Sequence, residues 1–235
     1  MAGRCQIISE ALQHAGLPFS VSEFVFNTER YYFCVMENRK ISKADKTRQF
    51  IVEKTAPVFN KKGYAGTSLT DLVEATGLTK GSIYGNFKNK DEVAIAAFEH
   101  NLKQVNKVVA EEMGKRSTYR EKLLAYTHAY GSFLEFPFPD GGCPVLNTAV
   151  EADDTHPELR EKAKGAVMAW KETLAAMVRK GIAENEFRND LDPEQVALTI
   201  IATIEGAVMI TKVTGRLDFR RAIMASIDEM VERLS

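Results

Sequence analysis

The stretch GYAGTSLTDLVEATGLTKGSIYGNFKNKDEVAIAAF, residues Gly63–Phe98, sets the fold expected for this chain. Ser68 can accept a hydrogen bond from the backbone of Asp71 three residues on, a capping-box pattern that marks a helix N-terminus. Gly77 suits the end of that helix, because glycine adopts the left-handed conformation at little cost. Thr79 can cap the next helix. The stretch therefore predicts two short helices joined by a tight turn.

The second of these helices has two distinct faces. Ile83 and Phe87 lie four residues apart and point to the same side, toward the core. The opposite side carries small and amide side chains: Ser82, Gly85 and Asn86, with Tyr84 at the flank. A two-helix unit whose second helix presents such side chains outward fits the major groove of DNA.

Two lysines indicate an anionic partner. Lys80 and Lys90 each follow a helix cap, in a first turn where the helix dipole disfavours a cation by roughly 0.3–1 kcal/mol. A phosphate at each position would offset this cost, because the exposed N–H groups there already favour an anion. Gly81 and Gly85 weaken the helix by about 1 kcal/mol each, but they let its backbone approach a partner closely. The alternative is a surface helix on which these residues have no functional role.

Charge is unevenly distributed along the chain, although the formal net charge is only −1. Residues 37–90 hold 11 basic and 5 acidic side chains, a net charge of +6. Residues 91–235 hold 18 basic and 24 acidic side chains, a net charge of −6. A basic segment joined to an acidic one indicates that the first meets a polyanion, although two differently solvated surfaces would give the same counts.

Composition excludes several classes of protein. A hydrophobic content of 45% with 27% charged residues is typical of a folded chain. Three cysteines without a CxxC or a Cys/His cluster predict neither a disulfide framework nor a zinc site, and favour a reducing cytoplasm. The longest apolar stretch, Val196–Val213, is interrupted by Glu205 and Lys212, so no membrane span is expected, and the first residues lack the pattern of a signal peptide.

Almost every segment after residue 44 has a helical pattern, and none alternates as a strand does. The first helix should run from about Lys43 to Asn60, with a kink or an early end at Pro57, because proline lacks the amide hydrogen. Gly63 should stop it. Later helices are expected at about 89–112, 117–135, 144–152, 156–185, 192–213 and 217–233.

Residues 1–35 differ from the rest of the chain. Their periodicity is weak, and they hold two of the three cysteines, Cys5 and Cys34. Met36 is followed by a polar, basic sequence that would make a natural start for the basic segment. We hypothesise that Met36 is the initiator and that residues 1–35 are a dispensable extension.

The motifs of residues 51–92 resemble the TetR/AcrR family of bacterial transcriptional regulators. The matching elements are Ile51-Val52, Val58-Phe59, Gly63-Tyr64, Thr67-Ser68, Gly77–Tyr84, Phe87 and Asn89–Glu92. The resemblance implies an all-α fold with an N-terminal three-helix helix-turn-helix DNA-binding domain at 44–104. A larger helical domain at 105–235 would bind the effector and dimerise, and residues 1–35 would stand outside both domains.

By this resemblance Ser68–Phe87 is the helix-turn-helix, and Thr79–Phe87 is its recognition helix. The positions that match DNA contacts of the family are Ser68, Thr70, Thr79, Lys80, Gly81, Ser82, Tyr84, Gly85, Asn86 and Lys90. Tyr84 and Lys90 would mostly bind phosphates, whereas Ser82, Gly85 and Asn86 lie where family members read bases. Gly85 departs from the bulky residue often found there, which bears on the operator sequence.

The second half of the chain offers candidates for dimerisation and for an effector site. The helix 193–214 is apolar on nearly all sides, so it must be covered either by its own domain or by a second copy of the chain. The effector-pocket candidates are Phe133, Phe136, Phe138, Cys143, Asn147 and Trp170, although such side chains also form ordinary cores. Cys143, Asn147 and Glu151 form a stripe, and the GCPVxN pattern looks like one that borders the ligand cavity in a branch of the family. Cys143 is either a thiol sensor or a small buried hydrophobe.

Two other classes of protein compete with a regulator. A helical enzyme would need a catalytic motif, but GxSxG, HExxH, Walker A and GxGxxG patterns are all missing and the four histidines lack ligand spacing, so no catalytic residue, metal or cofactor is predicted. An architectural DNA-binding protein would not need a large acidic second domain. With these classes disfavoured, the resemblance to the TetR/AcrR family implies a cytoplasmic homodimeric repressor that binds a palindromic DNA operator and is released by a small-molecule effector, without a membrane partner.

Overall fold

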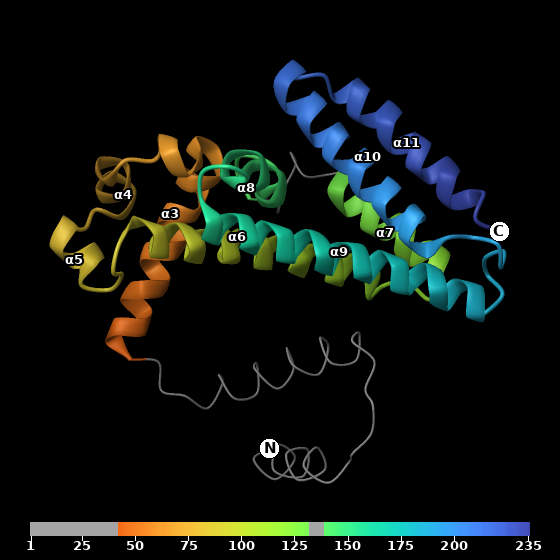
Figure 1. Ribbon diagram of the computed structural model, residues 1–235, viewed down its shortest axis with the longest axis horizontal. Helices are drawn as coiled ribbons and strands as arrows, with labels where there is room; N and C mark the ends of the chain where they lie inside the picture. The colour runs from red at the N-terminus through yellow and green to blue at the C-terminus, as the bar shows by residue number, and fades with distance from the viewer. Residues whose placement is uncertain (1–41, 132–138) are drawn as a thin grey trace, which may run out of the picture. The chain divides into compact units, whose positions relative to one another are not determined.

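The computed structural model describes residues 42–131 and 139–235, and residues 44–235 form one compact unit. All regular structure in the described residues is helical, which confirms the all-α fold class (Figure 1). The helices are α3 (Lys43–Gly66), α4 (Leu69–Thr76), α5 (Lys80–Tyr84), α6 (Lys90–Met113), α7 (Tyr119–Gly131), α8 (Pro144–Ala152), α9 (Pro157–Ala183), α10 (Pro193–Thr214) and α11 (Leu217–Glu232). The proposed extension at 1–35 lies outside the described residues.

Proline begins three consecutive helices of the second half. Pro144, Pro157 and Pro193 each occupy the first turn of α8, α9 or α10. Proline is favoured there, because the amide hydrogen that it lacks would have no partner within the helix. The N-terminus of α10 is also capped by Asp192, whose carboxylate accepts hydrogen bonds from the amides of Glu194 and Gln195.

Helix α3 does not end at Pro57, so the prediction of an early end there is wrong. The helix continues through Pro57, and its dihedral angles break at Gly63, where φ is 73° and ψ is 177°. Proline cannot bond the carbonyl of Glu53, but Glu53 is exposed, and water can satisfy its carbonyl. The break at Gly63 is therefore the feature that separates the main part of α3 from its last turn.

Two hydrophobic clusters fill the unit, and α6 belongs to both. The first cluster joins α3–α6 and includes Ala152 and Leu159 from α8 and α9. The second fills the space among α6–α11, with Leu174 and Ile200 fully buried. Because α6 continues through both clusters, a domain boundary near residue 104 falls inside a helix and stays a prediction.

Helix α10 packs against α9 and α11, and Figure 1 shows α10 and α11 running side by side. By length and composition α10 could cross a membrane, so the expectation that Glu205 and Lys212 exclude a span was too strong. The core helix of a globular protein passes the same test, and 39% of the apolar window of α10 is buried within the chain. One such helix gives no argument for a membrane.

Candidate functional site

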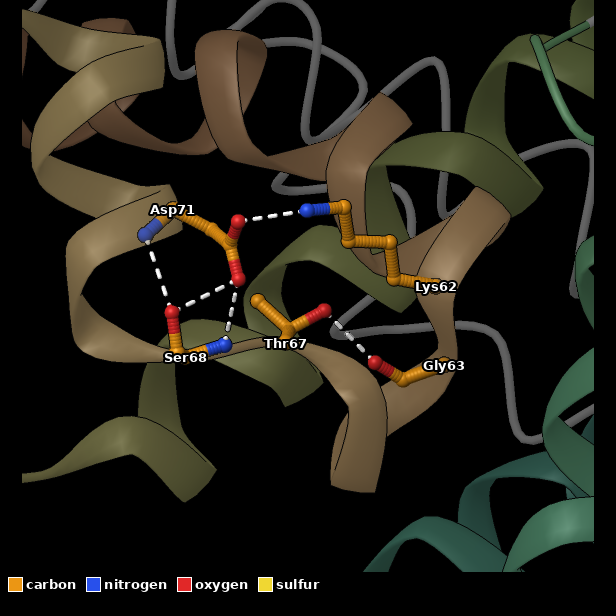
Figure 2. Close-up of polar contacts among 5 residues, drawn as sticks. All are labelled: Lys62, Gly63, Thr67, Ser68 and Asp71. Carbon is orange, nitrogen blue, oxygen red and sulfur yellow. Dashed lines mark hydrogen bonds and ion pairs between the residues drawn. The ribbon is translucent and has the colours of Figure 1, made fainter.

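The N-terminus of α4 is fixed by the capping box that the sequence predicts (Figure 2). The Ser68 hydroxyl accepts a hydrogen bond from the Asp71 amide at 3.2 Å, and the Asp71 carboxylate accepts one from the Ser68 amide at 2.7 Å. Lys62 of α3 forms an ion pair with the same carboxylate. The Lys62 ammonium and the Ser68 donors hold the pKa of Asp71 well below its usual range. These contacts fix the helix-turn-helix to the end of α3.

The turn between α4 and α5 also forms as predicted. Gly77 is left-handed, with φ 67°, and its amide bonds the carbonyl of Val73. The Thr79 hydroxyl accepts a hydrogen bond from the Ser82 amide at 3.2 Å and so caps α5. Ile83 and Phe87 are buried, which confirms the inward face.

Helix α5 is shorter than the recognition helix Thr79–Phe87 that the resemblance implies. Its α-helical part is Lys80–Tyr84, followed by a turn at Gly85 and Asn86. Glycine and asparagine are weak helix formers, and the Asn86 amide nitrogen donates to the Ser82 carbonyl at 2.9 Å and so holds the turn. The amide of Phe87 still bonds the carbonyl of Ile83, so the chain follows a helical path to Phe87.

The predicted DNA-contact residues fall into two groups by exposure. The side chains of Ser82, Tyr84, Asn86 and Lys90 are half-buried. The exposed residues are Ser68, Thr70, Thr79, Lys80, Gly81 and Gly85. The two groups come from α4 with its cap, from α5 with its cap and the turn that follows it, and from the first turn of α6. Together these residues offer hydroxyl, amide, backbone and ammonium groups to a partner.

Arg48 is a residue of this site that sequence reasoning missed. From α3 its guanidinium donates to the Asn86 carbonyl at 2.5 Å and to the Glu92 carboxylate at 2.7 Å, and it lies 3.9 Å over the Phe87 ring. The amide of Lys88 and this guanidinium hold the pKa of Glu92 below its usual value. Arg48 and Glu92 are 44 residues apart in the sequence, so no local pattern indicated the pair.

Lys90 has a partner within the chain, Tyr64. Its ammonium lies 4.3 Å from the centroid of the Tyr64 ring, a cation–π contact. The Tyr64 hydroxyl donates to the Asp91 carboxylate, which raises the pKa of Tyr64 to about 12. His156, the cap of α9, packs edge-on against the Tyr64 ring at 4.5 Å. Part of the cost of a cation at the start of α6 is therefore already offset without a phosphate.

The carboxylate of Glu151 in α8 stabilises the chain where α3 breaks at Gly63. Glu151 accepts hydrogen bonds from the amides of Tyr64 at 2.6 Å and Ala65 at 2.7 Å. These amides are free to donate because the chain turns at Gly63. A Cβ atom on Gly63 would lie 2.7 Å from Cδ of Glu151. Glu151 thus binds the last turn of α3, which leads directly into α4.

A second set of contacts joins α3 to the loop before α8. The Asn60 amide donates to the carbonyls of Asp140 at 2.8 Å and Gly142 at 2.9 Å. The Asn147 amide donates to the Asn60 carbonyl at 3.0 Å, and its oxygen accepts from Lys212 of α10 at 3.1 Å. A small pocket of about 30 Å³, which has room for water, is lined by Asn60, Asn147 and Glu151 among other residues. Asn147, predicted as a pocket residue, therefore lies at the junction of α3, α8 and α10.

Cys143 and Trp170, the other described pocket candidates, belong to one buried cluster in the second half. The Cys143 thiol donates to Oε1 of Glu205 at 2.9 Å. Trp170 stacks on Tyr130 with ring centroids 4.8 Å apart, and Tyr126 stacks on Tyr130 at 5.5 Å. Burial and the neighbouring carboxylate raise the pKa of the Cys143 thiol, so it stays protonated, which favours the small buried hydrophobe over a reactive sensor. Phe133, Phe136 and Phe138 lie outside the described residues.

Sequence reasoning missed Glu205 as a member of this cluster, although it noted the acid within an apolar helix. Burial raises the pKa of Glu205 to about 7, from 4.5 in the unfolded chain. Between these values the folded protein keeps a proton that the unfolded chain has released, so stability falls as the pH rises from about 4.5 to about 7. The stabilisation is fully present below this window and is lost above it.

We therefore expect Glu205→Gln to stabilise the protein above neutral pH by about 3 kcal/mol, because the amide needs no proton to stay neutral. Near pH 4 the two proteins should have similar free energies of unfolding. Urea denaturation of both proteins across this pH range measures the difference. If the free energies of unfolding of the two proteins differ by the same amount at both ends of the pH range, the pKa of Glu205 is not raised.

Two family profiles match the chain. "Bacterial regulatory proteins, tetR family" matches residues 51–97, and "Tetracyclin repressor-like, C-terminal domain" matches residues 120–227. The chain is 25% identical over 158 residues to the fatty acid metabolism regulator protein of Bacillus subtilis, covering 67% of this chain and 79% of that protein. It is 24% identical over 166 residues to the transcriptional repressor DhaR of a Mycobacterium species, covering 71% and 82%.

Solved structures agree with the profiles. A TetR-family transcriptional regulator from Cytophaga hutchinsonii is 48% identical, with a TM-score of 0.79, and the match covers 84% of this chain and 98% of that one. A TetR regulator from Chloroflexus aurantiacus is 37% identical, with a TM-score of 0.78, and the match covers 81% and 96%. Among the described residues no group of His, Cys, Asp and Glu could hold a metal ion.

Proposed function

Since this chain belongs to the TetR family of helix-turn-helix transcriptional regulators, we propose that it is a cytoplasmic repressor that binds a palindromic operator as a homodimer and is released by a small-molecule effector. The observation that carries the proposal is the capped α4–turn–α5 unit with its polar outer surface. A relative that is named a repressor supports the direction of regulation. We propose that the chain acts by binding alone, without catalysis.

In the proposed complex α5 enters the major groove. Ser82, Gly85 and Asn86 face the bases, while Tyr84 and Lys90 bind phosphates. Ser68, Thr70, Thr79, Lys80 and Gly81 complete the contact with the backbone of the DNA. Domain 44–104 would supply this surface, and domain 105–235 would supply the effector site and the dimer interface.

The proposed release mechanism uses the contacts between α8 and α3. An effector in the second domain moves α8, and α8 moves the last turn of α3 through Glu151 and Asn147. That turn carries Tyr64, whose ring supports Lys90, and it leads into α4. Both the recognition helix and the phosphate contact then shift, so two recognition helices no longer meet two major grooves together.

Footprinting on the DNA upstream of the protein's own gene tests the proposal. A protected inverted repeat would establish both the operator and the twofold symmetry of the bound protein. Complete lack of protection there and in a genome-wide pull-down would refute the regulator function. An alternative as an architectural DNA-binding protein would be favoured if the protected sites shared no repeat.

On that operator we expect Lys90→Ala to weaken binding about 3- to 10-fold and to reduce the slope of log affinity against log salt by about 1, equally for operator and random DNA. The matched change Asn86→Ala should leave the salt slope unchanged and relax the preference at one base position, at a cost of about 1–3 kcal/mol. Fluorescence anisotropy over a range of salt concentrations measures both. An unchanged slope for Lys90→Ala would remove the phosphate contact from the proposal.

A further inference from the structure

The N-terminal cap of α9 is a histidine, His156. Its Nδ1 accepts a hydrogen bond from the Leu159 amide at 3.3 Å. A ring nitrogen that accepts a hydrogen bond carries no proton, so in the neutral ring the proton is on Nε2. This Nε2 lies 3.6 Å from Oδ1 of Asp91, in the first turn of α6. One side chain therefore caps α9 and faces the start of α6.

A cap alone does not require an imidazole. Asparagine, aspartate, serine and threonine are the favoured caps, because their short side chains reach the free amides. An aspartate in place of His156 would bring a second carboxylate near Asp91, whereas the N–H of the imidazole presents a positive dipole to it. The ring is only 11% exposed, and it packs at 83° against the ring of Tyr64 with centroids 4.5 Å apart. His156 thus makes two contacts beyond capping.

Both of these contacts involve neighbours of Lys90. The Tyr64 hydroxyl donates to Oδ1 of Asp91, the same oxygen that faces His156. The Lys90 ammonium lies 4.3 Å from the centroid of the Tyr64 ring. The Tyr64 ring is therefore held by the His156 ring and, through its hydroxyl, by Asp91, and it supports the ammonium of Lys90.

Such support matters for a lysine that binds a phosphate. A lysine side chain is a point charge on a flexible stem, and binding has to immobilise it. A contact that already holds the ammonium in the free protein reduces this entropic cost. If the Tyr64 ring moves, the Lys90 ammonium loses its cation–π contact and with it the fixed position.

We propose that His156 is a positioning residue for the phosphate contact of Lys90, acting through the Tyr64 ring and the Asp91 carboxylate. The inference rests on the proposed function, in which Lys90 binds DNA. Helix α9 also carries Trp170 into the second hydrophobic cluster, so His156 links that cluster to the DNA surface. This link differs from the Glu151 contact, because Glu151 binds the backbone amide of Tyr64, whereas His156 contacts its ring.

His156→Asn tests the proposal without DNA, because asparagine caps a helix well but lacks the imidazole ring. In protein labelled with ¹³C-lysine, the Tyr64 ring should shift the ε-methylene protons of Lys90 upfield, and Lys90→Ala identifies their signal. We expect His156→Asn to lose at least half of this shift while circular dichroism shows the helices intact. His156→Ser, a second good cap, should give the same result.

DNA binding supplies the second measurement. We expect His156→Asn to weaken binding about 3-fold, for operator and random duplex alike, and to change affinity less than 1.5-fold once Lys90 is alanine. His128→Asn is the matched control, because it removes the contact of His128 in α7 with Asp228 in α11. This control should leave both the Lys90 signal and the affinity unchanged.

Three results would overturn the inference. They are a Lys90 shift that persists in folded His156→Asn, an affinity that His156→Asn leaves unchanged or lowers equally with and without Lys90, and loss of folding in both the Asn and Ser variants. The last result would give His156 a purely structural role.

The inference and the proposed function fail in different ways. If the operator is protected but the Lys90 signal does not depend on His156, the positioning role is wrong and the regulator function stands. If neither operator nor random duplex binds, the proposed function fails whatever the Lys90 signal shows, and the inference that rests on it fails as well.

Discussion

Replacing Gly63 by alanine is expected to lower the free energy of unfolding by about 3 kcal/mol or more and to weaken operator binding at least tenfold. The backbone at Gly63, with φ 73° and ψ 177°, lies in a region that only glycine adopts readily, so a side chain there costs about 1–3 kcal/mol in strain. The added Cβ would also lie 2.7 Å from Cδ of Glu151 and displace the carboxylate from the amides of Tyr64 and Ala65. Urea denaturation and operator titration measure the two effects.

Gly66→Ala is the matched control, because Gly66 ends the same helix three residues later. A Cβ there meets only the Cβ of Lys62, at 3.7 Å, which is an ordinary contact. Alanine at this position should leave stability equal or slightly higher. If Gly63→Ala and Gly66→Ala behave alike, the break at Gly63 has no structural importance.

A double variant that combines Gly63→Ala with Glu151→Ala isolates the contact between α8 and α3. Glu151→Ala alone loses two charge-assisted hydrogen bonds to the amides of Tyr64 and Ala65. Gly63→Ala removes the same bonds, so the two losses should not add, and the double variant should be more stable than the sum predicts by about 1–3 kcal/mol. Additive losses would show that Glu151 and Gly63 act independently, and the coupling of α8 to α3 would lose its main support.

Local patterns account for most of what the sequence predicted correctly. The capping box of Ser68 and Asp71, the left-handed Gly77 and the cap at Thr79 each depend on residues within four positions of one another. Helix α8 occupies 144–152 as expected, because Pro144 is favoured in a first helical turn. Such signals need no knowledge of the rest of the chain.

Contacts between distant residues could not be predicted. The contacts Arg48–Glu92, Glu151–Tyr64 and Cys143–Glu205 form only after α3, α6, α8 and α10 have packed together. The same packing explains why Asn147 lies at the junction with α3. Pro57 shows the opposite kind of error. The local rule that proline ends a helix fails here, because water can satisfy the carbonyl of the exposed Glu53, which proline cannot bond.

A glutamate in place of Met209 is expected to convert the proposed dimer into folded monomers. Helices α10 and α11 expose large apolar side chains: Leu198, Met209, Val213, Leu217 and Phe219, of which Val213 is 82% exposed. A patch of this kind suits a second copy of the chain. In a twofold interface the same residue occurs on both sides, so one substitution buries two like charges near each other.

Operator affinity should then fall at least about 100-fold, because a monomer engages only one half-site and loses the advantage of two linked contacts. Sedimentation velocity measures the mass, and circular dichroism checks that the helices remain. Met168→Glu, at an equally exposed methionine of α9 outside the patch, should leave both mass and affinity unchanged. If Met209→Glu stays dimeric with full affinity, α10 and α11 do not form the interface. The exposed apolar side chains of α10, the one described helix long and apolar enough to span a membrane, would then have to be covered by something other than a second copy of the chain.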